Sequence, residues 1–386
     1  MIRTKFQEML GTKYPIIQAG MGPYSTFKLC AAAAKAGGVG IISTIGMGAG
    51  LSSATPEAAT KVFGKGRPKD LIKQSIFNMI EELKDAPDAV FGVNVPVSSE
   101  FITVATRLIK GTIEAYNESE EVRKKLRLII TSAGDPLPWA VNAAEKGSKK
   151  IKRAIKEEMP GVKWAHVVPA VQHAKRAERA DVDFIIATGR EGGAHCAWRD
   201  ISTIVLIPEV VKQVNKPVVA GGGMCDGVSL AAALAMGAVG IQMGTRMIAT
   251  QESDFEQMWK EAIVKRTEQD TLVGRGLFGP MRFLRNSQSL KIVDETIKLE
   301  GGKLFKGIPV GSNMAIMRLE MDGLANLFDG DEDNSIILGG VVTGRIHSIP
   351  KVKELFDSIM TEAEEIIKTC LLYTSPSPRD LSTSRM

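Results

Sequence analysis

One imidazole and two glycine-rich turns are the features of this sequence whose residue types and spacing could support chemistry. His195 ends the glycine-rich segment 189–195, and the two turns lie at residues 221–223 and 244–245. Bare backbone N–H groups at such turns can hold the oxygens of a phosphate. The sequence places no cluster of carboxylates and no His/Cys/Asp group with metal-ligand spacing beside them. This set of residues favours an organic cofactor that carries a phosphate and brings its own reactivity.

The elements that must position these residues follow a strand–helix repeat. Apolar runs at 184–187, 218–220 and 241–243 alternate with helix-length segments at 204–214 and 228–236. Strands that are apolar throughout, without polar alternation, are typical of parallel β/α units. Because both turns follow strands directly, they match the phosphate site that (β/α)₈ barrels build after strands 7 and 8.

The preceding part of the chain completes the repeat. Further strands are expected at 14–18, 39–43, 91–95, 128–131 and 164–168. Helices are expected between them at 26–36, 68–83, 100–117, 136–160 and 171–179. A segment at 253–264 would supply the eighth helix. We therefore predict an α/β fold, a (β/α)₈ TIM barrel spanning residues 1–266.

The remainder of the chain does not continue this repeat. Residues 267–369 contain a glycine-rich stretch with several arginines and end in an amphipathic segment near 352–367. We interpret them as a smaller C-terminal addition that covers the barrel mouth, with a separate small domain as the alternative. Residues 370–386 are rich in Ser, Thr and Pro and resemble a translated sequencing adapter, so we interpret them as a non-native tail.

Composition limits the classes of partner. The 386 residues are 44% hydrophobic and 24% charged, with a net charge of +5. Basic residues are scattered except at 146–153, which we interpret as a solvated helix face without the aromatic residues of a nucleic-acid groove. Neither a membrane-spanning run nor a signal-peptide core is seen, so we expect no membrane partner. Four cysteines without paired spacing favour a reducing, cytoplasmic location: Cys30, Cys196, Cys225 and Cys370.

Five motifs occur in an order and at a spacing that are specific when taken together. They are Pro15-Ile16-Ile17-Gln18-Ala19-Gly20-Met21, Phe91-Gly92-Val93-Asn94, Glu191-Gly192-Gly193-Ala194-His195, Ala220-Gly221-Gly222-Gly223 and Gln242-Met243-Gly244-Thr245-Arg246. Together they resemble the nitronate monooxygenase family, formerly called 2-nitropropane dioxygenases, which includes flavin-dependent enoyl-ACP reductases. The resemblance covers about residues 10–255 well and residues 339–350 weakly.

The resemblance implies FMN as the cofactor and assigns roles to individual residues. Gly20 and Met21 would lie along the isoalloxazine ring, and Asn94 would hydrogen-bond its polar side. Gly193 would lie in the loop that meets the cofactor, and His195 matches the family's active-site histidine. The residues that would hold the phosphate, or lead into its turn, are Gly222, Gly223, Gln242, Met243, Gly244 and Thr245.

This sequence departs from the family pattern in the loop that carries the histidine. The usual order is Glu-Ala-Gly-Gly-His, whereas this chain has Ala194 directly before His195. A glutamine that commonly lies three residues before the glutamate is replaced by Thr188. The neighbouring Cys196 suggests a Cys–His nucleophile, but adjacent residues in a chain rarely face each other productively.

The resemblance leaves the reaction open between two alternatives with small-molecule substrates. One is the oxidation of alkyl nitronates by O₂. The other is the NAD(P)H-dependent reduction of an enoyl thioester carried by acyl carrier protein. The arginines Arg275, Arg282 and Arg285 could receive an anion in either case. A third alternative, of another class, is a non-catalytic barrel that binds a phosphorylated ligand.

Overall fold

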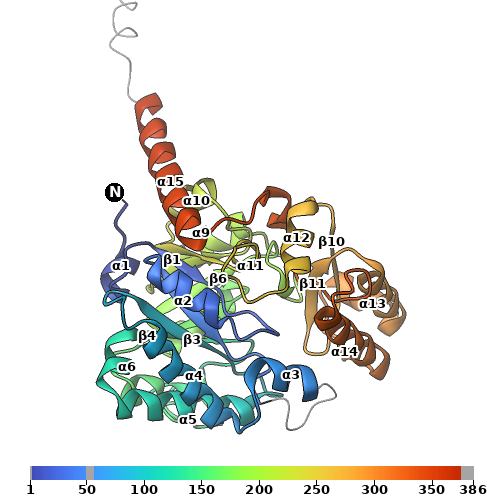
Figure 1. Ribbon diagram of the computed structural model, residues 1–386, viewed down its shortest axis with the longest axis horizontal. Helices are drawn as coiled ribbons and strands as arrows, with labels where there is room; N and C mark the ends of the chain where they lie inside the picture. Colours follow the sequence, from blue (N-terminus) through green and yellow to red (C-terminus); the bar gives the residue numbers. More distant parts are fainter. Residues whose placement is uncertain (1, 49–55, 375–386) are drawn as a thin grey trace, which may run out of the picture.

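The computed structural model describes residues 2–48 and 56–374, in which eight parallel strands close into a barrel (Figure 1). The strands follow one another around the barrel in chain order. They are β1 (Ile16–Gln18), β2 (Val39–Ser43), β3 (Val90–Pro96), β4 (Leu126–Ser132), β5 (Lys163–Val168), β6 (Phe184–Thr188), β8 (Val218–Gly221) and β9 (Gly240–Met243). The predicted (β/α)₈ barrel is confirmed.

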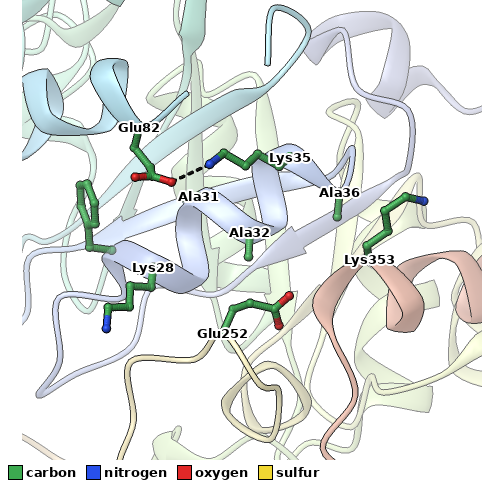
Figure 2. Close-up of a pocket in the computed structure, with 9 residues that line it drawn as sticks. Lys28, Ala31, Ala32, Lys35, Ala36, Glu82, Glu252 and Lys353 are labelled. Carbon is green, nitrogen blue, oxygen red and sulfur yellow. Dashed lines mark hydrogen bonds and ion pairs between the residues drawn. The ribbon is translucent and has the colours of Figure 1, made fainter. Parts of the chain in front are cut away.

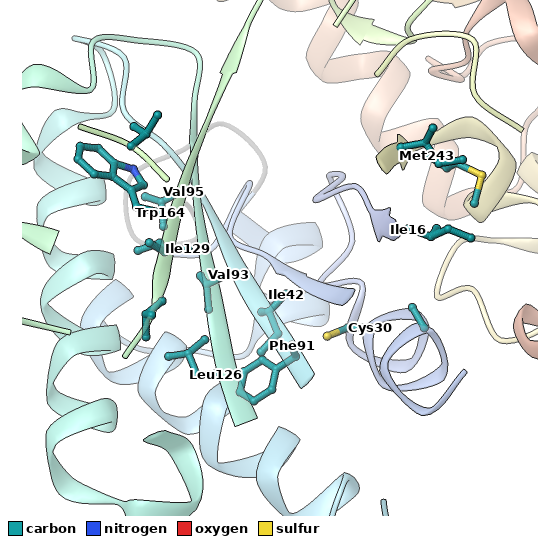
Figure 3. Close-up of a cluster of buried hydrophobic side chains, with 14 of the residues drawn as sticks. Ile16, Cys30, Ile42, Phe91, Val93, Val95, Leu126, Ile129, Trp164 and Met243 are labelled. Atoms are coloured by element: carbon teal, nitrogen blue, oxygen red, sulfur yellow. The ribbon is translucent and has the colours of Figure 1, made fainter. Parts of the chain in front are cut away.

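The segments that connect these strands contain helices, and the longer helices cover the barrel from outside. The first of them, α2 (Phe27–Lys35), approaches β2 closely, since a Cβ at Gly40 would lie 1.9 Å from the backbone oxygen of Cys30. Its alanine-rich sequence permits that approach. The other helices of this layer are α4 (Pro68–Glu82), α5 (Ile102–Glu118), α6 (Glu120–Lys125), α8 (Val171–Arg179), α9 (Thr203–Gln213) and α10 (Gly227–Ala235). Apolar side chains such as Phe91, Ile129 and Trp164 fill the space between strands and helices (Figure 3).

The barrel interior is a separate apolar cluster formed by alternate strand residues. Because successive side chains of a strand point to opposite faces, one set of residues points inward. The helix α1 (Lys5–Leu10) closes the amino-terminal end of this interior with Phe6 and Leu10. The ring centroids of Phe6 and Phe184 lie 5.7 Å apart. The strand residues of the cluster are Ile17, Val39, Ile41, Val90, Leu128, Ile130, Ala165, Phe184, Ile186 and Val219.

The eighth helix of the outer layer is α15 (Val352–Thr374), which packs against α10 and α2. Its Phe356 and Ile359 are buried in the same cluster as the outer faces of the strands. The prediction of an eighth helix at 253–264 is therefore wrong. The helix found there, α12 (Gln257–Lys265), packs elsewhere because Trp259 joins Tyr24 in an aromatic cluster. Helix α15 also includes the first five residues of the segment interpreted as a non-native tail; residues 375–386 lie outside the described ranges.

The predicted helix at 136–160 is also wrong. This stretch contains only η2 (Leu137–Trp139) and the four-residue α7 (Ile155–Glu158). Gly147 adopts φ +83° in its middle, and prolines at 136 and 138 stand at its start. The lysine-rich part is mostly exposed, and the glycine in its middle is a poor helix former. Among the described elements, no helix is both long and apolar enough to cross a membrane.

The C-terminal addition is built on a small antiparallel sheet with the order β10–β11–β7. Strands β10 (Thr271–Arg275) and β11 (Pro280–Leu284) come from the addition, whereas β7 (Ala194–His195) comes from the loop after β6 of the barrel. Helices α13 (Ser287–Lys298) and α14 (Met314–Asp329) pack on this sheet, to the right of the barrel in Figure 1. The shared strand β7 joins the addition to the carboxyl-terminal end of the barrel.

Candidate active site

A polar layer follows the apolar interior at the carboxyl-terminal end of the barrel strands. Continuing the inward alternation past the apolar cluster reaches Asn94, Ser132, Thr188, Gly221 and Gln242. Three of them stand side by side in the sheet register, with Thr188 opposite Gly221 and Gly221 opposite Gln242. The Asn94 Nδ2 donates a hydrogen bond to Ser132 Oγ at 3.2 Å. Two predicted site residues, Asn94 and Gln242, therefore lie on one rim.

The segment after β1 crosses this rim, and its backbone packs directly against the rim at a glycine. A Cβ at Gly20 would lie 2.5 Å from Asn94 Cβ, so only glycine lets the backbone pass here. A Cβ at Gly244 would lie 3.5 Å from the Met21 Sδ, so Met21 reaches the turn after β9. The structure thus brings together Gly20, Met21, Asn94 and Gly244, which come from three different strand ends.

The two predicted phosphate turns are neighbours because β8 and β9 pair directly. Gly222 and Gly223 adopt φ +84° and +79°, a conformation that favours glycine. A Cβ at Gly222 would lie 2.8 Å from the Gly189 backbone oxygen, so a side chain would fill this cradle. The second turn begins the short helix α11 (Thr245–Ile248) with Gly244 as its N-cap. Positive-φ glycines at the first turn and bare backbone at both turns fit a phosphate-bearing group.

The loop after β6 is fixed between these turns and the addition. The Glu191 carboxylate accepts hydrogen bonds from Thr203 N at 2.9 Å and Thr203 Oγ1 at 2.6 Å, which ties the loop to the start of α9. A Cβ at Gly193 would lie 2.7 Å from Gly340 N, so two backbones pass in contact. Gly340 N also donates to Thr245 Oγ1 at 3.0 Å. Glu191 is a structural residue here and is not available as a catalytic base.

His195 is held by β-pairing rather than in a flexible loop. It stands opposite Met281 of β11, and the adjacent Cys196 N donates to Pro280 O at 2.8 Å. The preceding Ala194 takes φ +62°, the left-handed region that is unfavourable for a residue with a Cβ. The departure from the family's glycine at this position is therefore accommodated by backbone strain within a fixed ladder.

The electrostatic environment keeps the His195 imidazole neutral. Solvent reaches the ring, yet protein atoms surround it closely enough that burial lowers the pKa, and the Arg275 charge lowers it further, to about 4. A neutral imidazole has one N–H donor and one lone pair. At pH 7 this group can accept a proton or orient an anion, but it does not itself carry charge.

Arg275 is the cation of this region and is largely buried, with 6% of its surface exposed. Its Nε donates to Val310 O at 2.9 Å, and its guanidinium lies 5.3 Å from the centre of the Trp198 ring. Burial lowers the pKa of Arg275, while the charge of Glu320 raises it. Of the three arginines considered for an anion, this one influences the histidine.

The other two arginines serve different purposes. Arg282 donates to Arg190 O at 3.2 Å and to Thr271 Oγ1 at 3.0 Å, so its side chain braces the β6 loop against β10. Arg285 lies at an exposed position at the end of β11. Arg282 is buried but engaged in these two hydrogen bonds, and Arg285 is exposed, so Arg275 is the arginine whose charge lowers the pKa of His195.

Two residues named from the sequence are not directed toward the rim. The Met243 side chain is fully buried in the layer between strands and helices, and only its backbone oxygen contributes, accepting from Ala19 N at 2.9 Å. The Cys196 thiol donates to Ala194 O at 3.2 Å, and burial raises the pKa of Cys196 to about 11. A thiol so protonated is a poor nucleophile at neutral pH.

A groove of about 450 Å³ lies away from this rim, on the helix layer (Figure 2). Its floor is the alanine face of α2, with Ala31, Ala32 and Ala36, and Glu82 and Lys35 form an ion pair at its edge. It contains neither histidine nor cysteine. In the described ranges 2–48 and 56–374, no three His, Cys, Asp or Glu side chains come together in a way that could hold a metal ion.

Sequence reasoning missed two residues of the rim. Gly340 lies far along the chain from Gly193 and Thr245, which it contacts, and only the weak resemblance of residues 339–350 pointed to it. Thr188 was noted only as a departure from the family pattern. The alternation of side chains along β6 could have identified it. Every second residue of the strand points into the barrel, which gives Phe184, Ile186 and then Thr188.

Comparisons with known proteins identify the family to which this barrel is similar. Residues 3–362 match the family model described as nitronate monooxygenase. A protein of Staphylococcus saprophyticus named probable nitronate monooxygenase is 30% identical, covering 74% of this chain and 79% of the relative. A hydroxy-methyl-oxo-octahydro-indene-carboxyl-CoA dehydrogenase of Rhodococcus jostii is 27% identical, covering 94% of this chain and 96% of the relative.

Solved structures share this fold over nearly the whole chain. The structure of FabK from Thermotoga maritima has a TM-score of 0.73 and 30% identity, covering 97% of this chain and 100% of that one. A nitroalkane oxidase from Streptomyces ansochromogenes has a TM-score of 0.65 at 20% identity, over 94% of this chain and 99% of that one, and supports the fold alone.

Proposed function

The chain belongs to the nitronate monooxygenase family, and from that premise we propose that it is an FMN-dependent oxidoreductase that oxidises alkyl nitronates with O₂. Members of the family are generally flavin-dependent oxidoreductases. FMN is favoured over a dinucleotide because the two adjacent turns suit a terminal phosphate. The support for a flavin in this chain is the glycine cradle at Gly222 and Gly223 beside Gly244 and Thr245.

The residues of the rim divide the work of binding such a cofactor. The turns after β8 and β9 would hold the phosphate through backbone N–H groups, and Thr245 would add its hydroxyl hydrogen, since its oxygen already accepts from Gly340 N. A side chain at position 20 would displace Asn94, so Gly20 preserves the position from which Asn94 would hydrogen-bond a flat ring. The flavin, when bound, supplies the reversible uptake of electrons that no side chain of this site offers.

His195 would act on the substrate. Its neutral ring can orient a nitronate oxygen through its N–H or accept a proton from a carbon acid through its lone pair. The strand pairing with Met281 fixes where the ring stands relative to the barrel. Fixed placement matters because general acid–base groups act only within hydrogen-bond reach of the reacting atom.

The charge around His195 is the observation that supports an anionic substrate. Arg275 contributes a buried positive charge, and the nearby carboxylates are already engaged. Glu191 caps α9, while Glu320 accepts from Leu277 N and attracts Arg275. A neutral imidazole beside a cation favours an anionic substrate, and an alkyl nitronate is an anion.

NAD(P)H-dependent reduction of an enoyl thioester is the second candidate. It is favoured by the length of the matches, because FabK and the indene-carboxyl-CoA dehydrogenase relative align with nearly the whole chain, the addition included. The nitronate monooxygenase relative aligns with 74% of it. A thioester bound to coenzyme A or to acyl carrier protein needs a surface beyond the rim, which the addition would provide.

Anaerobic stopped-flow spectroscopy tests the two candidates. The FMN-loaded protein is mixed with propyl-2-nitronate and, separately, with NADH and NADPH, while flavin absorbance is followed. We expect the nitronate to bleach the flavin and the reduced nicotinamides to act slowly. Rapid bleaching by NADH or NADPH, productive with a crotonyl thioester and absent with nitronate, would replace the first candidate by the second.

A further inference from the structure

A carboxylate of the addition is buried at the tip of the β10–β11 hairpin, whose second strand pairs with His195. Glu320 lies on α14 and has 7% of its surface exposed. Its Oε2 accepts a hydrogen bond from the backbone N–H of Leu277, in the turn between β10 and β11. Burial raises the pKa of Glu320, while this N–H and the Arg275 charge oppose the increase. Because a buried carboxylate is costly unless it is paired, these contacts tie Glu320 to the turn.

The turn that Glu320 holds packs on the residue that pairs with His195. Gly276 N donates to Gly279 O at 2.8 Å, which closes the turn. A Cβ at Gly276 would lie 2.5 Å from Met281 Cε, so the turn backbone lies directly on the Met281 side chain. Met281 is buried and stands opposite His195 in the sheet register. Direct contacts therefore connect the anchored turn to the strand position of His195.

The same turn also reaches the imidazole ring itself. A Cβ at Gly279 would lie 3.9 Å from His195 Cδ2. The ring centroid of Phe278 lies 6.2 Å from that of His195 and 4.4 Å from that of Phe101. Phe101 directly precedes α5, so Phe278 links the hairpin to the loop after β3 of the barrel. A displacement of the turn would therefore change the surroundings of the imidazole.

A second buried side chain holds α14 without involving the turn. Gln288 of α13 is 3% exposed, and its Nε2 donates to Leu319 O at 2.6 Å. Leu319 directly precedes Glu320 in α14. The hydrogen bond of Gln288 thus joins two helices of the addition, whereas the hydrogen bond of Glu320 joins a helix to the hairpin tip beside His195. The two residues differ in what they hold and not in burial.

We propose that Glu320 is a positioning residue of the active site, which fixes the turn 276–279 and, through Met281 and Gly279, the placement of the His195 imidazole. This inference rests on the proposed role of His195. Glu320 acts through the turn and not on the substrate. The turn needs an acceptor oxygen at this position, because the group to be held is the Leu277 N–H.

Three variants separate positioning from general stability. Glu320→Leu removes the acceptor and keeps a side chain that can be buried, while Glu320→Gln keeps an acceptor oxygen. Gln288→Leu is the matched control, because it removes a buried hydrogen bond to the neighbouring residue of α14. For each full-length protein we would measure amide hydrogen exchange at Leu277, the imidazole NMR signals of His195, the melting temperature, FMN affinity and steady-state turnover. The His195 signals are assigned by comparison with His195→Ala.

In the wild type we expect the Leu277 N–H to be protected from exchange. Glu320→Leu should exchange this hydrogen about 10-fold faster, since one hydrogen bond is lost, and should change the His195 signals. Its kcat should fall about 10-fold with FMN affinity within about 2-fold of the wild type, because acid–base assistance depends on placement. Glu320→Gln should resemble the wild type in all these properties. Gln288→Leu should melt at a lower temperature but keep the His195 signals and kcat.

Several results would overturn the proposal. Rapid exchange of the Leu277 N–H in the wild type would show that the carboxylate does not hold the turn, even if Glu320→Leu failed to fold. Unchanged His195 signals or unchanged kcat in Glu320→Leu would show that the turn does not position the imidazole for the reaction. Equal changes of the His195 signals in Gln288→Leu would assign Glu320 to the stability of the addition.

Failure of the proposed function would look different. A wild type that turns over neither a nitronate nor an enoyl thioester would refute the proposed reactions. The exchange and NMR measurements need no substrate, so they would still decide whether Glu320 positions the imidazole.

Discussion

The two ends of the barrel interior are built from the same strands but in opposite ways. At the amino-terminal end, inward side chains such as Val39, Leu128 and Phe184 meet Phe6 of α1 and exclude water. At the carboxyl-terminal end, the inward positions two or four residues further along the strands are Asn94, Gly221 and other polar or glycine residues. One end is filled by apolar side chains, and the other leaves hydrogen-bonding groups available.

This difference separates stability from binding along a single set of strands. Apolar burial at the closed end supplies free energy of folding without specific chemistry. The open end gives up packing for glycine turns and polar groups, which are useful only when a ligand occupies them. Changes at the closed end should therefore affect folding alone, and changes at the open end should affect binding or turnover.

The largest expected effect is at the open end. His195→Ala should lower turnover by about 10²–10⁴-fold, because general acid–base assistance is lost. The bound-flavin spectrum should remain, since His195 stands on β7 and outside the phosphate turns. Steady-state turnover with the substrate that the stopped-flow experiment identifies measures the effect, with the exposed His173→Ala as control. Activity within 2-fold of the wild type would move the role to another residue.

Phe6→Ala tests the closed end. Removing a fully buried phenylalanine should lower the free energy of unfolding by about 3–5 kcal/mol, measured by urea denaturation. Phe305→Ala, on an exposed side chain, should change it by less than about 0.5 kcal/mol. FMN affinity of the folded Phe6→Ala protein should equal that of the wild type. A parallel loss of affinity would show that the two ends are coupled.

A third prediction concerns His166, which faces outward from β5 and sharpens the contrast with His195. It is buried among Thr131, Gly134, Asp135 and His173, and burial lowers its pKa to about 4, although the Asp135 charge opposes this. The unfolded chain, with the ordinary pKa of 6.5, binds more protons between these values. Stability is therefore full above about pH 6.5 and is lost as the pH falls toward 4.

The size of this effect follows from the shift in pKa. Urea denaturation at pH 7.5 and near pH 4.5 should differ by up to about 3 kcal/mol from this residue. His166→Gln should remove that part of the difference, since glutamine does not titrate. If the variant and the wild type lose stability in parallel with pH, His166 is not the titrating group.

The smallest effect is predicted for Cys196, although it adjoins His195. Because its thiol is protonated and paired with a backbone oxygen, Cys196→Ser should change turnover by less than about 2-fold. Alkylation rates of the native protein with iodoacetamide provide an independent measure and should show slow reaction at this residue. A rapid reaction at pH 7, or a large loss of turnover, would restore the nucleophile hypothesis.

The sequence predicted the barrel well because each strand carries its own local signal. Short, continuous apolar runs between glycine turns have few alternatives, and their order implies the closed parallel sheet. The segment 253–264 was wrongly assigned to the outer layer of the barrel, because an amphipathic pattern predicts a helix but not where that helix packs. The contacts of Trp259 with Tyr24 and with the Leu338 backbone oxygen, which place α12, and the long return of α15 to the barrel depend on packing between distant residues.

The same distinction applies to the site. Glycines at 222, 223 and 244 could be placed from the sequence because a strand followed by glycine is a local pattern. The pairing of His195 with β11 could not, since β7 has two residues and its partner lies about 85 positions later in the chain. The hydrogen bond from the hairpin turn to Glu320 was also beyond reach, because its two residues lie 43 positions apart in the chain.

Titration of the flavin-free protein with FMN by isothermal calorimetry tests the central claim most directly, namely that the open end is a cofactor site. Gly222→Ala places a Cβ against the Gly189 backbone at the first turn. Gly330→Ala is the control, because Gly330 has a similar positive φ but its Cβ would meet nothing within 4 Å. We predict one FMN per chain, about 10-fold weaker binding or worse in Gly222→Ala, and wild-type binding in Gly330→Ala. No heat of binding in the wild type would show that the open end does not bind FMN, and equal affinities in all three proteins would show that the Gly222 turn is not part of the site.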